Sequence, residues 1–199
     1  MDCKALAKIA AELGREADAR ELSDRARRYC EKLETLWCEE KGIYLCRRLD
    51  TGKFCEVLTP CSFYPLLTGA CPKEHIDQML REHYYNTKEF YGKFIIPTCA
   101  RNTRAFRDND YFRGRIWPPI NLLVYLALKE GRQDEACADL ARRSPDLLMQ
   151  NWRRAGCVYE NYNSVTGAGG DVFSSDGYYH WGALLSFMGI LEGETGGRR

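Results

Sequence analysis

The sequence lacks several features that would identify a membrane or nucleic-acid-binding protein. It contains no apolar run of the ~18 to 20 residues that a membrane-spanning helix needs. Residues 1–16 turn charged within a few positions and do not resemble a signal peptide. Basic and acidic residues number 29 and 28, so the net charge of +1 provides no long-range field toward nucleic acid or an anionic membrane. We therefore expect no nucleic-acid partner and no membrane association.

The ten cysteines also lack the spacing of a metal site. They form no CxxC pair, and no histidine follows them at zinc-finger spacing, so we predict no metal and no cofactor. Disulfide scaffolds are usually small and have little core, whereas this chain is 45% hydrophobic and has long apolar segments. We predict reduced thiols and a cytoplasmic location.

Apolar periodicity predicts helices of two kinds. Amphipathic patterns cover residues 3–13, 15–38, 73–84 and 133–152, and segments that are apolar on most sides cover residues 62–68, 118–128 and 177–191. Pro145 predicts a kink or break near Ser144 in the helix that contains it. Between the long helices, residues 43–47 and 53–57 flank a turn-forming cluster at 50–52, which predicts a small β-hairpin.

The predicted helices alternate between water-facing and fully covered, as in a barrel of two concentric helix layers. A closed barrel of six pairs needs roughly twice this length, from helices of about 15 and loops of about 10 residues. We therefore predict an all-α fold, a partial (α/α)6 barrel with a small β-hairpin, over residues 1–192, followed by a polar tail at 193–199. Half a barrel leaves apolar surface uncovered, so we expect self-association or complementation by an N-terminal half.

Polar and aromatic residues gather at the entries of the apolar helices. They form the segments YFRGRIWPPIN at 111–121, YENYN at 159–163 and DVFSSD at 171–176. In a barrel, such loops open at one end and face a common axial pocket. A sugar ring suits such a pocket, because its C–H faces pack on aromatic rings while its hydroxyls need polar partners. A small carbohydrate is therefore the expected substrate.

The strings YFRGRIWPPIN, VYENYNSVTGAGGDV and SSDGYYHWGALL, in this order and spacing, resemble the C-terminal signature of glycoside hydrolase family 63 and the trehalase-related clan. The mannosylglycerate hydrolase-like branch is the most similar, and the resemblance extends over nearly the whole chain. It implies an inverting glycosidase with an (α/α)6 catalytic barrel. In that mechanism one carboxylic acid protonates the leaving oxygen, while a carboxylate activates water on the opposite ring face.

By this resemblance, Glu160 matches the general base of the clan. The general acid is an Asp in an earlier motif of the family, and nothing in this sequence matches it, so we expect the chain to begin inside the barrel. Phe112 stands where relatives usually have Trp, which keeps a stacking face. Ala168 and Gly170 stand where relatives often have acidic residues, which removes charge near the pocket.

Further residues are predicted to contact the substrate. They are Tyr111, Phe112, Arg113, Trp117, Tyr162, Asp176 and His180. The two arginines of the first segment have a structural alternative. Arg113 and Arg115 either orient substrate by forked hydrogen bonds or form ion pairs with Asp108, Asp110 or Asp171.

Other members of this set have structural alternatives too. Ser174, Ser175 and Asp176 immediately precede a predicted helix, so we expect them to cap it. His180 is expected inside that apolar helix, as a core or pocket-wall residue. Trp117 lies beside a buried helix, where an aromatic side chain is often part of the core.

Three functions fit these observations. The leading one is the C-terminal half of an inverting hydrolase of small α-glucosides or α-mannosides, which has its base but lacks its acid and alone hydrolyses poorly. The second is a non-catalytic carbohydrate-binding or scaffold remnant, favoured by the missing acid and by Ala168 and Gly170. The third is a barrel isomerase of the sugar epimerase type, which normally relies on histidine bases, whereas His180 is the sole histidine near the motifs.

Overall fold

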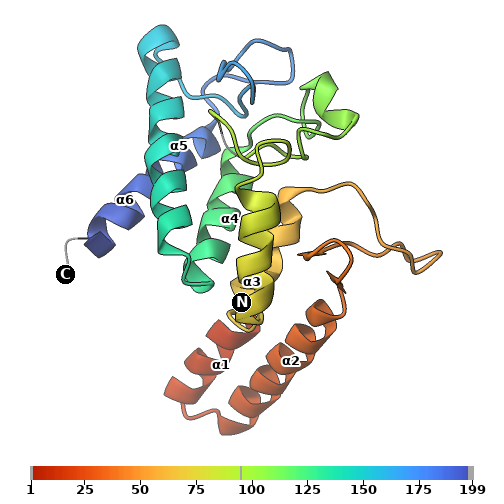
Figure 1. Cartoon of the computed structure of the whole chain (residues 1–199). Helices are drawn as coiled ribbons and strands as arrows, with labels where there is room; N and C mark the ends of the chain where they lie inside the picture. Colours follow the sequence, from red (N-terminus) through yellow and green to blue (C-terminus); the bar gives the residue numbers. More distant parts are fainter. Residues whose placement is uncertain (1, 95, 197–199) are drawn as a thin grey trace.

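The computed structural model describes residues 2–94 and 96–196. Its elements follow in the order α1 (Asp2–Glu12), α2 (Glu16–Glu34), β1 (Trp37–Cys38), β2 (Ile43–Tyr44), η1 (Pro60–Thr68), α3 (Lys73–Met79), η2 (Leu80–Tyr84), η3 (Ala105–Asp108), α4 (Pro118–Glu130), α5 (Asp134–Ala155), η4 (His180–Ala183) and α6 (Leu184–Gly196). η2 is π-helical, and η1, η3 and η4 are 3-10 helices. α4 and α5 lie side by side, and α1 and α2 form a hairpin at one end of the molecule (Figure 1).

The predicted alternation of covered and water-facing helices is confirmed. α4 packs against η1, α5 and α6, and it buries Val124, Ala127 and Leu128. It begins at Pro118, where the missing N–H of proline costs no hydrogen bond. α2, in contrast, has Ala26 as its buried residue, so its charged side faces water.

Apolar side chains are exposed on α4 and α6, the helices predicted to be covered, and also on α1. Leu123 of α4 is 39% exposed, and Phe187 and Ile190 of α6 are 43% and 56% exposed. Leu6 and Ile9 of α1 are also exposed. This agrees with the expectation that part of a barrel leaves apolar helix surface in water.

The predicted β-hairpin forms only close to its turn, where Cys55 N donates to Cys46 O and Arg48 N donates to Lys53 O, each at 2.8 Å. The two-stranded sheet pairs Trp37 with Tyr44 and Cys38 with Ile43, whereas the predicted strands share one bridge, between residues 47 and 54. Ile43 and Tyr44 are buried against the core, while residues 46–53 are exposed. The two-stranded sheet therefore lies against the core, while the hairpin predicted around the turn-forming cluster lies mostly in water.

Of the kink or break predicted near Ser144, the break does not occur, because α5 runs without interruption from Asp134 to Ala155. An interior proline costs a helix about 3 kcal/mol. Apolar residues on both sides of Pro145, including Leu140 and Leu147, are buried, and their packing offsets this cost. α6 approaches the proline closely, since a Cβ added at Gly189 would lie 3.0 Å from Pro145 Cγ.

The last helix begins later and ends later than the sequence indicated. Residues 177–179 are not helical; η4 begins at His180 and α6 at Leu184. α6 extends to Gly196, so the first residues of the predicted polar tail are helical, and residues 197–199 lie outside the described part of the chain.

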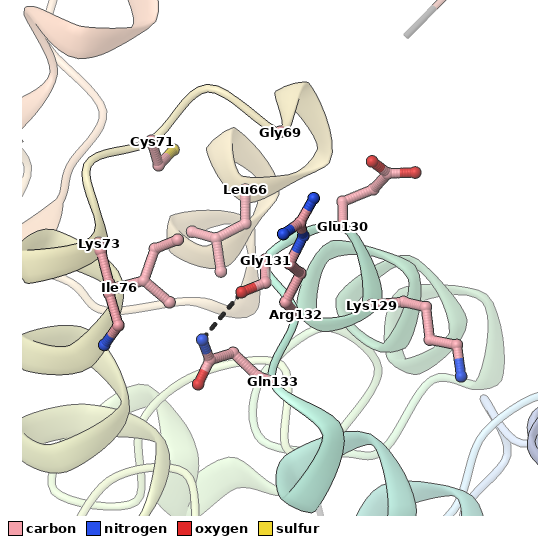
Figure 2. Close-up of a pocket in the computed structure, with 10 residues that line it drawn as sticks. All are labelled: Leu66, Gly69, Cys71, Lys73, Ile76, Lys129, Glu130, Gly131, Arg132 and Gln133. Carbon is pink, nitrogen blue, oxygen red and sulfur yellow. Dashed lines mark hydrogen bonds between the residues drawn. The ribbon is translucent and has the colours of Figure 1, made fainter. Parts of the chain in front are cut away.

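A cavity of about 600 Å³ lies where η1, α3 and the turn between α4 and α5 meet (Figure 2). Its wall includes Leu66, Ile76 and Arg132, and Gln133 Nε2 donates a hydrogen bond to Gly131 O at 2.8 Å. The cavity lies at the C-terminal end of α4, about 20 Å along the helix from the motif loops that precede Pro118. It is therefore separate from the predicted sugar site.

A buried histidine joins η2 to the turn between the two strands. His83 Nδ1 lies 2.6 Å from Glu89 Oε2, and its Nε2 lies 2.7 Å from Lys41 O. Two acceptors require a proton on both ring nitrogens. Burial acts to lower the pKa of His83, but the hydrogen bonds to Glu89 and Lys41 and the charges of Glu89 and Glu82 outweigh it and raise that pKa.

The raised pKa of His83 predicts that stability falls as pH increases. The imidazolium contributes fully below its unfolded pKa of about 6.5, and its contribution is lost as pH rises through the higher folded pKa. We expect the difference in unfolding free energy between wild type and His83→Gln to decrease by about 1–2 kcal/mol from pH 6 to pH 9. Urea denaturation at each pH measures it, and a difference that stays constant contradicts the prediction.

Candidate functional site

Short antiparallel pairings hold the three motif loops together. Ile116 and Tyr162 exchange backbone hydrogen bonds of 2.8 and 2.9 Å, so the loop before α4 lies beside the loop after α5. Glu160 donates its N–H to Asp176 O at 2.8 Å, which joins the second loop to the third. The predicted convergence of the three loops is therefore confirmed.

Several residues in these loops have left-handed backbone conformations. Asn109, Tyr111 and Tyr178 have φ of 42°, 46° and 60°, values that are costly for residues with a side chain. Gly114, with φ of 101°, also approaches its neighbours closely, because an added Cβ would lie 2.8 Å from Phe106 O. Strained backbone of this kind gathers at functional sites, where the surrounding contacts enforce it.

Glu160 lies in the second loop and is 7% exposed. Its backbone O accepts a hydrogen bond from Trp181 Nε1 at 3.3 Å, and its Oε2 accepts one from Asn161 Nδ2, also at 3.3 Å. Within the described residues no cation pairs with this carboxylate. Burial raises the pKa of Glu160, the charge of Asp176 raises it further, and the hydrogen bond from Asn161 partly offsets both.

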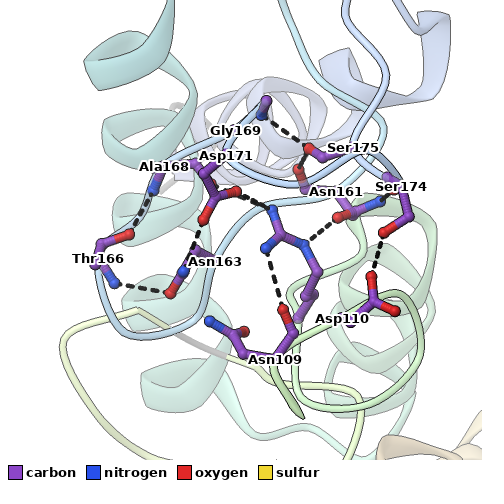
Figure 3. Close-up of polar contacts among 12 residues, drawn as sticks. Asn109, Asp110, Asn161, Asn163, Thr166, Ala168, Gly169, Asp171, Ser174 and Ser175 are labelled. Carbon is purple, nitrogen blue, oxygen red and sulfur yellow. Dashed lines mark hydrogen bonds and ion pairs between the residues drawn. The ribbon is translucent and has the colours of Figure 1, made fainter.

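The guanidinium of Arg115 is fully buried and donates to acceptors in all three loops. Figure 3 labels these acceptors, which belong to Asn109, Asn161, Ala168 and Asp171. Arg115 donates from Nε to Asn161 Oδ1 and from Nη2 to Asp171 Oδ1, the latter at 2.6 Å. Longer hydrogen bonds of 3.3 and 3.4 Å reach the backbone oxygens of Asn109 and Ala168. Of the alternatives left open for Arg115, the structure therefore contains the ion pair with Asp171.

The partners of Arg115 are held in turn. Asn163 Nδ2 donates to Asp171 Oδ2 at 2.8 Å. Burial acts to raise the pKa of Asp171, but the hydrogen bonds from Arg115 and Asn163 outweigh it, so that pKa is lowered. Asn161 Nδ2 donates to Ser174 O at 2.6 Å (Figure 3). Each partner therefore has a second contact that fixes its orientation.

The predicted capping role of Ser174, Ser175 and Asp176 is wrong. Ser174 Oγ donates to Asp110, and Ser175 Oγ donates to the backbone O of Asn161 at 2.7 Å. The extended pairing of residue 159 with residue 177 keeps this segment from starting a helix. The hydroxyls consequently bind across loops, not along a helix.

Arg113 forms the ion pairs that were one of its two alternatives. Its Nε and Nη2 lie 2.8 Å from Asp108 Oδ2 and Asp110 Oδ2. The arginine side chain is 50% exposed, so solvent screens these pairs. The hydrogen bond from Ser174 and the charge of Arg113 lower the pKa of Asp110.

Aromatic rings from the first and third loops form one cluster beside Glu160. Its members are Tyr111, Phe112, Trp117, Tyr179, His180 and Trp181. Phe112 stacks on Trp117 with centroids 4.2 Å apart, and Trp117 lies 5.9 Å from Trp181. Trp117 is buried while Phe112 is 50% exposed, so the cluster has an open aromatic face.

Two of the residues predicted to contact substrate, Tyr162 and His180, lie in surroundings that the sequence did not predict. Tyr162 is 0% exposed and belongs to the core, and its Oη accepts a hydrogen bond from Tyr159 N at 3.1 Å. His180 was expected inside an apolar helix, but it opens the short η4 and is exposed, stacked on Tyr179 at 5.5 Å. The core role predicted for His180 is therefore wrong.

Sequence reasoning did not single out Asn161, Tyr179 or Trp181. All three lie within or beside the quoted motifs, so adjacency to Glu160 and to His180 was the available signal. Their roles depend on side-chain hydrogen bonds and ring contacts between loops, which residue patterns do not reveal.

Several further properties concern only the described part of the chain. It contains no cluster of three or more His, Cys, Asp or Glu residues suited to hold a metal ion. None of its helices combines the length and apolarity required to cross a bilayer. The ten cysteines are unpaired.

Residues 1–182 match the mannosylglycerate hydrolase MGH1-like glycoside hydrolase domain. The chain belongs to this glycoside hydrolase family. It is 31% identical over 144 residues to mannosylglycerate hydrolase MGH1 of Selaginella moellendorffii, a match that covers 71% of this chain and 28% of the relative. It is 29% identical over 158 residues to mannosylglycerate hydrolase of Thermus thermophilus, a match that covers 78% of this chain and 35% of that relative. The chain thus spans about a third of the length of these relatives.

Solved structures of the same class share the fold. A family 63 mannosylglycerate hydrolase from another strain of Thermus thermophilus, in complex with Tris, superposes with a TM-score of 0.79 at 22% identity, over 94% of this chain and 42% of that one. Neutral trehalase of Saccharomyces cerevisiae superposes with a TM-score of 0.66 at 17% identity, over 87% of this chain and 31% of the trehalase chain. The predicted architecture, part of an (α/α)6 barrel, is confirmed.

Close packing explains why position 170, where relatives were expected to have an acidic residue, is a glycine in this chain. Gly169 and Gly170 lie against the ring of Tyr159, where an added Cβ would be 2.2 and 2.5 Å from ring atoms. Gly170 also has a φ of 67°. An acidic side chain at position 170 would therefore displace Tyr159, the residue that precedes Glu160.

The electrostatics of the site predict that Asp176→Asn lowers the pKa of Glu160. The substitution removes the negative charge that disfavours ionisation of the neighbouring carboxyl group. Carbon-13 NMR titration of the side-chain carboxyls measures the pKa, with Glu160→Gln to assign the resonance. Asp108→Asn, which removes a charge bound by Arg113, is the matched control and leaves the titration of Glu160 in place. An unchanged Glu160 titration in Asp176→Asn contradicts the prediction.

Proposed function

We propose that this chain is the C-terminal part of an inverting glycoside hydrolase barrel for small α-glucosides or α-mannosides, in which Glu160 is the general base. The observation that carries the proposal is a carboxylate without a cationic partner in the described residues, on a residue whose backbone O accepts a hydrogen bond from Trp181 of the aromatic cluster. A general base needs a carboxylate oxygen available to a water molecule. Asn161 occupies Oε2, which leaves Oε1 for that water.

The relatives support the choice of substrate class. Those named above from Selaginella moellendorffii and Thermus thermophilus are mannosylglycerate hydrolases, and the crystallised Thermus enzyme has also been solved with glucose and with Tris and D-glycerate. An aromatic cluster with Phe112 half-exposed suits the apolar face of a hexose. The whole enzyme's general acid lies in a part that this sequence does not match, so substrates that need a protonated leaving group require that part as well.

Activated aryl glycosides test Glu160 without the missing acid. A dinitrophenolate leaves without being protonated, so 2,4-dinitrophenyl α-mannoside or α-glucoside requires the base but not the acid. We expect the chain to hydrolyse one of them with the β-anomer as first product, which proton NMR detects. Glu160→Gln should reduce the rate by about 100-fold or more.

The control for this experiment is Glu130→Gln. Glu130 lines the cavity at the far end of α4, so its neutralisation should leave the rate unchanged. Release that is equal in wild type and Glu160→Gln removes Glu160 from the mechanism. The α-anomer as first product contradicts inversion.

A second candidate function, sugar binding without turnover, is supported by the stacked pair of Phe112 and Trp117 and by the unmatched general acid. Isothermal calorimetry with mannose, glucose and D-glycerate measures binding. We expect Phe112→Ala to weaken sugar binding by about tenfold, because it removes the exposed stacking face. Phe173→Ala is the matched control, since Phe173 is fully exposed and outside the aromatic cluster. Equal affinity in both variants contradicts a role for Phe112.

A further inference from the structure

The amide of Asn161 has one orientation that satisfies its neighbours. Its Oδ1 faces the Nε of Arg115, and a guanidinium has donors only. Its Nδ2 must therefore point the other way, where it meets Ser174 O at 2.6 Å and Glu160 Oε2 at 3.3 Å. Both N–H groups of the amide have an acceptor in this arrangement.

Arg115 is able to impose this orientation because it does not move easily. It is 0% exposed, and a buried guanidinium is stable only with a full set of acceptors. Asp171 supplies the balancing charge at 2.6 Å, and the backbone oxygens of Asn109 and Ala168 accept further N–H groups. The side chain thus spans the gap between the first and third loops.

We propose that Arg115, acting through Asn161, positions the carboxylate of Glu160. Arg115 donates to the amide oxygen, the amide nitrogen donates to one carboxylate oxygen, and the other oxygen is left for a ligand. The inference rests on the proposed role of Glu160 for its functional meaning. Arg115 and Asn161 are positioning residues in it, because neither is assigned a contact with substrate.

The hydrogen bond from Asn161 has an electrostatic effect as well as a geometric one. Burial and the charge of Asp176 both disfavour the ionised form of Glu160, and the Asn161 donor is the contact that favours it. Loss of this donor, or rotation of the amide so that its oxygen faces Glu160, therefore raises the pKa of that carboxyl group. A group that merely fills space would leave the pKa unchanged.

Two matched substitutions separate this role from general stability. Arg115→Lys keeps the positive charge beside Asp171 but loses the planar fork that reaches both Asp171 and Asn161. Arg113→Lys is its control, because Arg113 lies in the same motif and binds Asp108 and Asp110 instead. Circular dichroism establishes that each variant is folded.

The readout is proton–nitrogen NMR of the Asn161 side-chain amide, together with carbon-13 titration of Glu160. In wild type and Arg113→Lys, one amide proton should shift with pH at the Glu160 midpoint. In Arg115→Lys this tracking should be lost and the Glu160 midpoint should rise. The proposal is overturned if, in Arg115→Lys, the amide proton still shifts at the Glu160 midpoint and that midpoint is unchanged. It is also overturned if the Asn161 amide shift in wild type does not change as Glu160 titrates.

Asn161→Asp keeps the proposal testable if Arg115→Lys does not fold. An aspartate retains an acceptor for Arg115 but removes the donor to Glu160, so we expect the Glu160 midpoint to rise by about one pH unit or more. Val165→Asp adds the same charge in the same loop at an exposed position, without touching the donor. A rise as large in Val165→Asp as in Asn161→Asp assigns the effect to charge alone and overturns the proposal.

Neither measurement needs turnover. A chain that hydrolyses no glycoside but shows the expected titrations supports the positioning of Glu160 and contradicts only the proposed reaction. A chain that hydrolyses glycosides through Glu160 while its titration ignores Arg115 contradicts the positioning alone.

Discussion

The arrangement of the site depends on one buried charge. Arg115 has no exposed surface, and moving a guanidinium from water into a protein interior is costly unless its donors are satisfied. Its acceptors come from all three loops, at Asn109 before α4 and at Asn161, Ala168 and Asp171 after α5. Removing Arg115 would take the balancing cation from Asp171 and the Nε donor from Asn161, and one set of side-chain contacts between the loops would be lost.

The parts of the fold that the sequence predicted well are those set by local patterns. α4 follows from two prolines, a nearly continuous apolar segment and Gly131, all of which act within about four turns of helix. The convergence of the motif loops followed from the alternation of helix types, since consecutive pairs place their connections at one end. Glu160 was singled out by its motif, and its surroundings fit that choice without testing it.

The parts that the sequence did not predict are set by contacts between distant segments. Ser174 and Ser175 have the composition of helix caps, yet their hydroxyls bind Asp110 and Asn161 because the segment is already paired with residues 158–160. The sequence also did not predict the pairing of β1 with β2, because that pairing depends on burial of Ile43 and on packing against η1, which no local turn pattern reveals. Pro145 remained in a helix because tertiary packing outweighs its local cost.

The chemistry proposed for Glu160 requires two opposed conditions, and the site meets each by a different route. Burial and Asp176 raise the pKa of the carboxyl group, which increases its affinity for a proton taken from water. The same effects disfavour the ionised state that a base needs before it acts. The hydrogen bond from Asn161 favours the ionised state, and Asn161 is held in place by Arg115, which makes no contact with Glu160. Direct contact between Arg115 and Glu160 would lower the pKa far more and occupy the oxygen that water must reach. Because Arg115 acts on Glu160 through the neutral amide of Asn161, it orients the carboxylate without strongly lowering the pKa of that group.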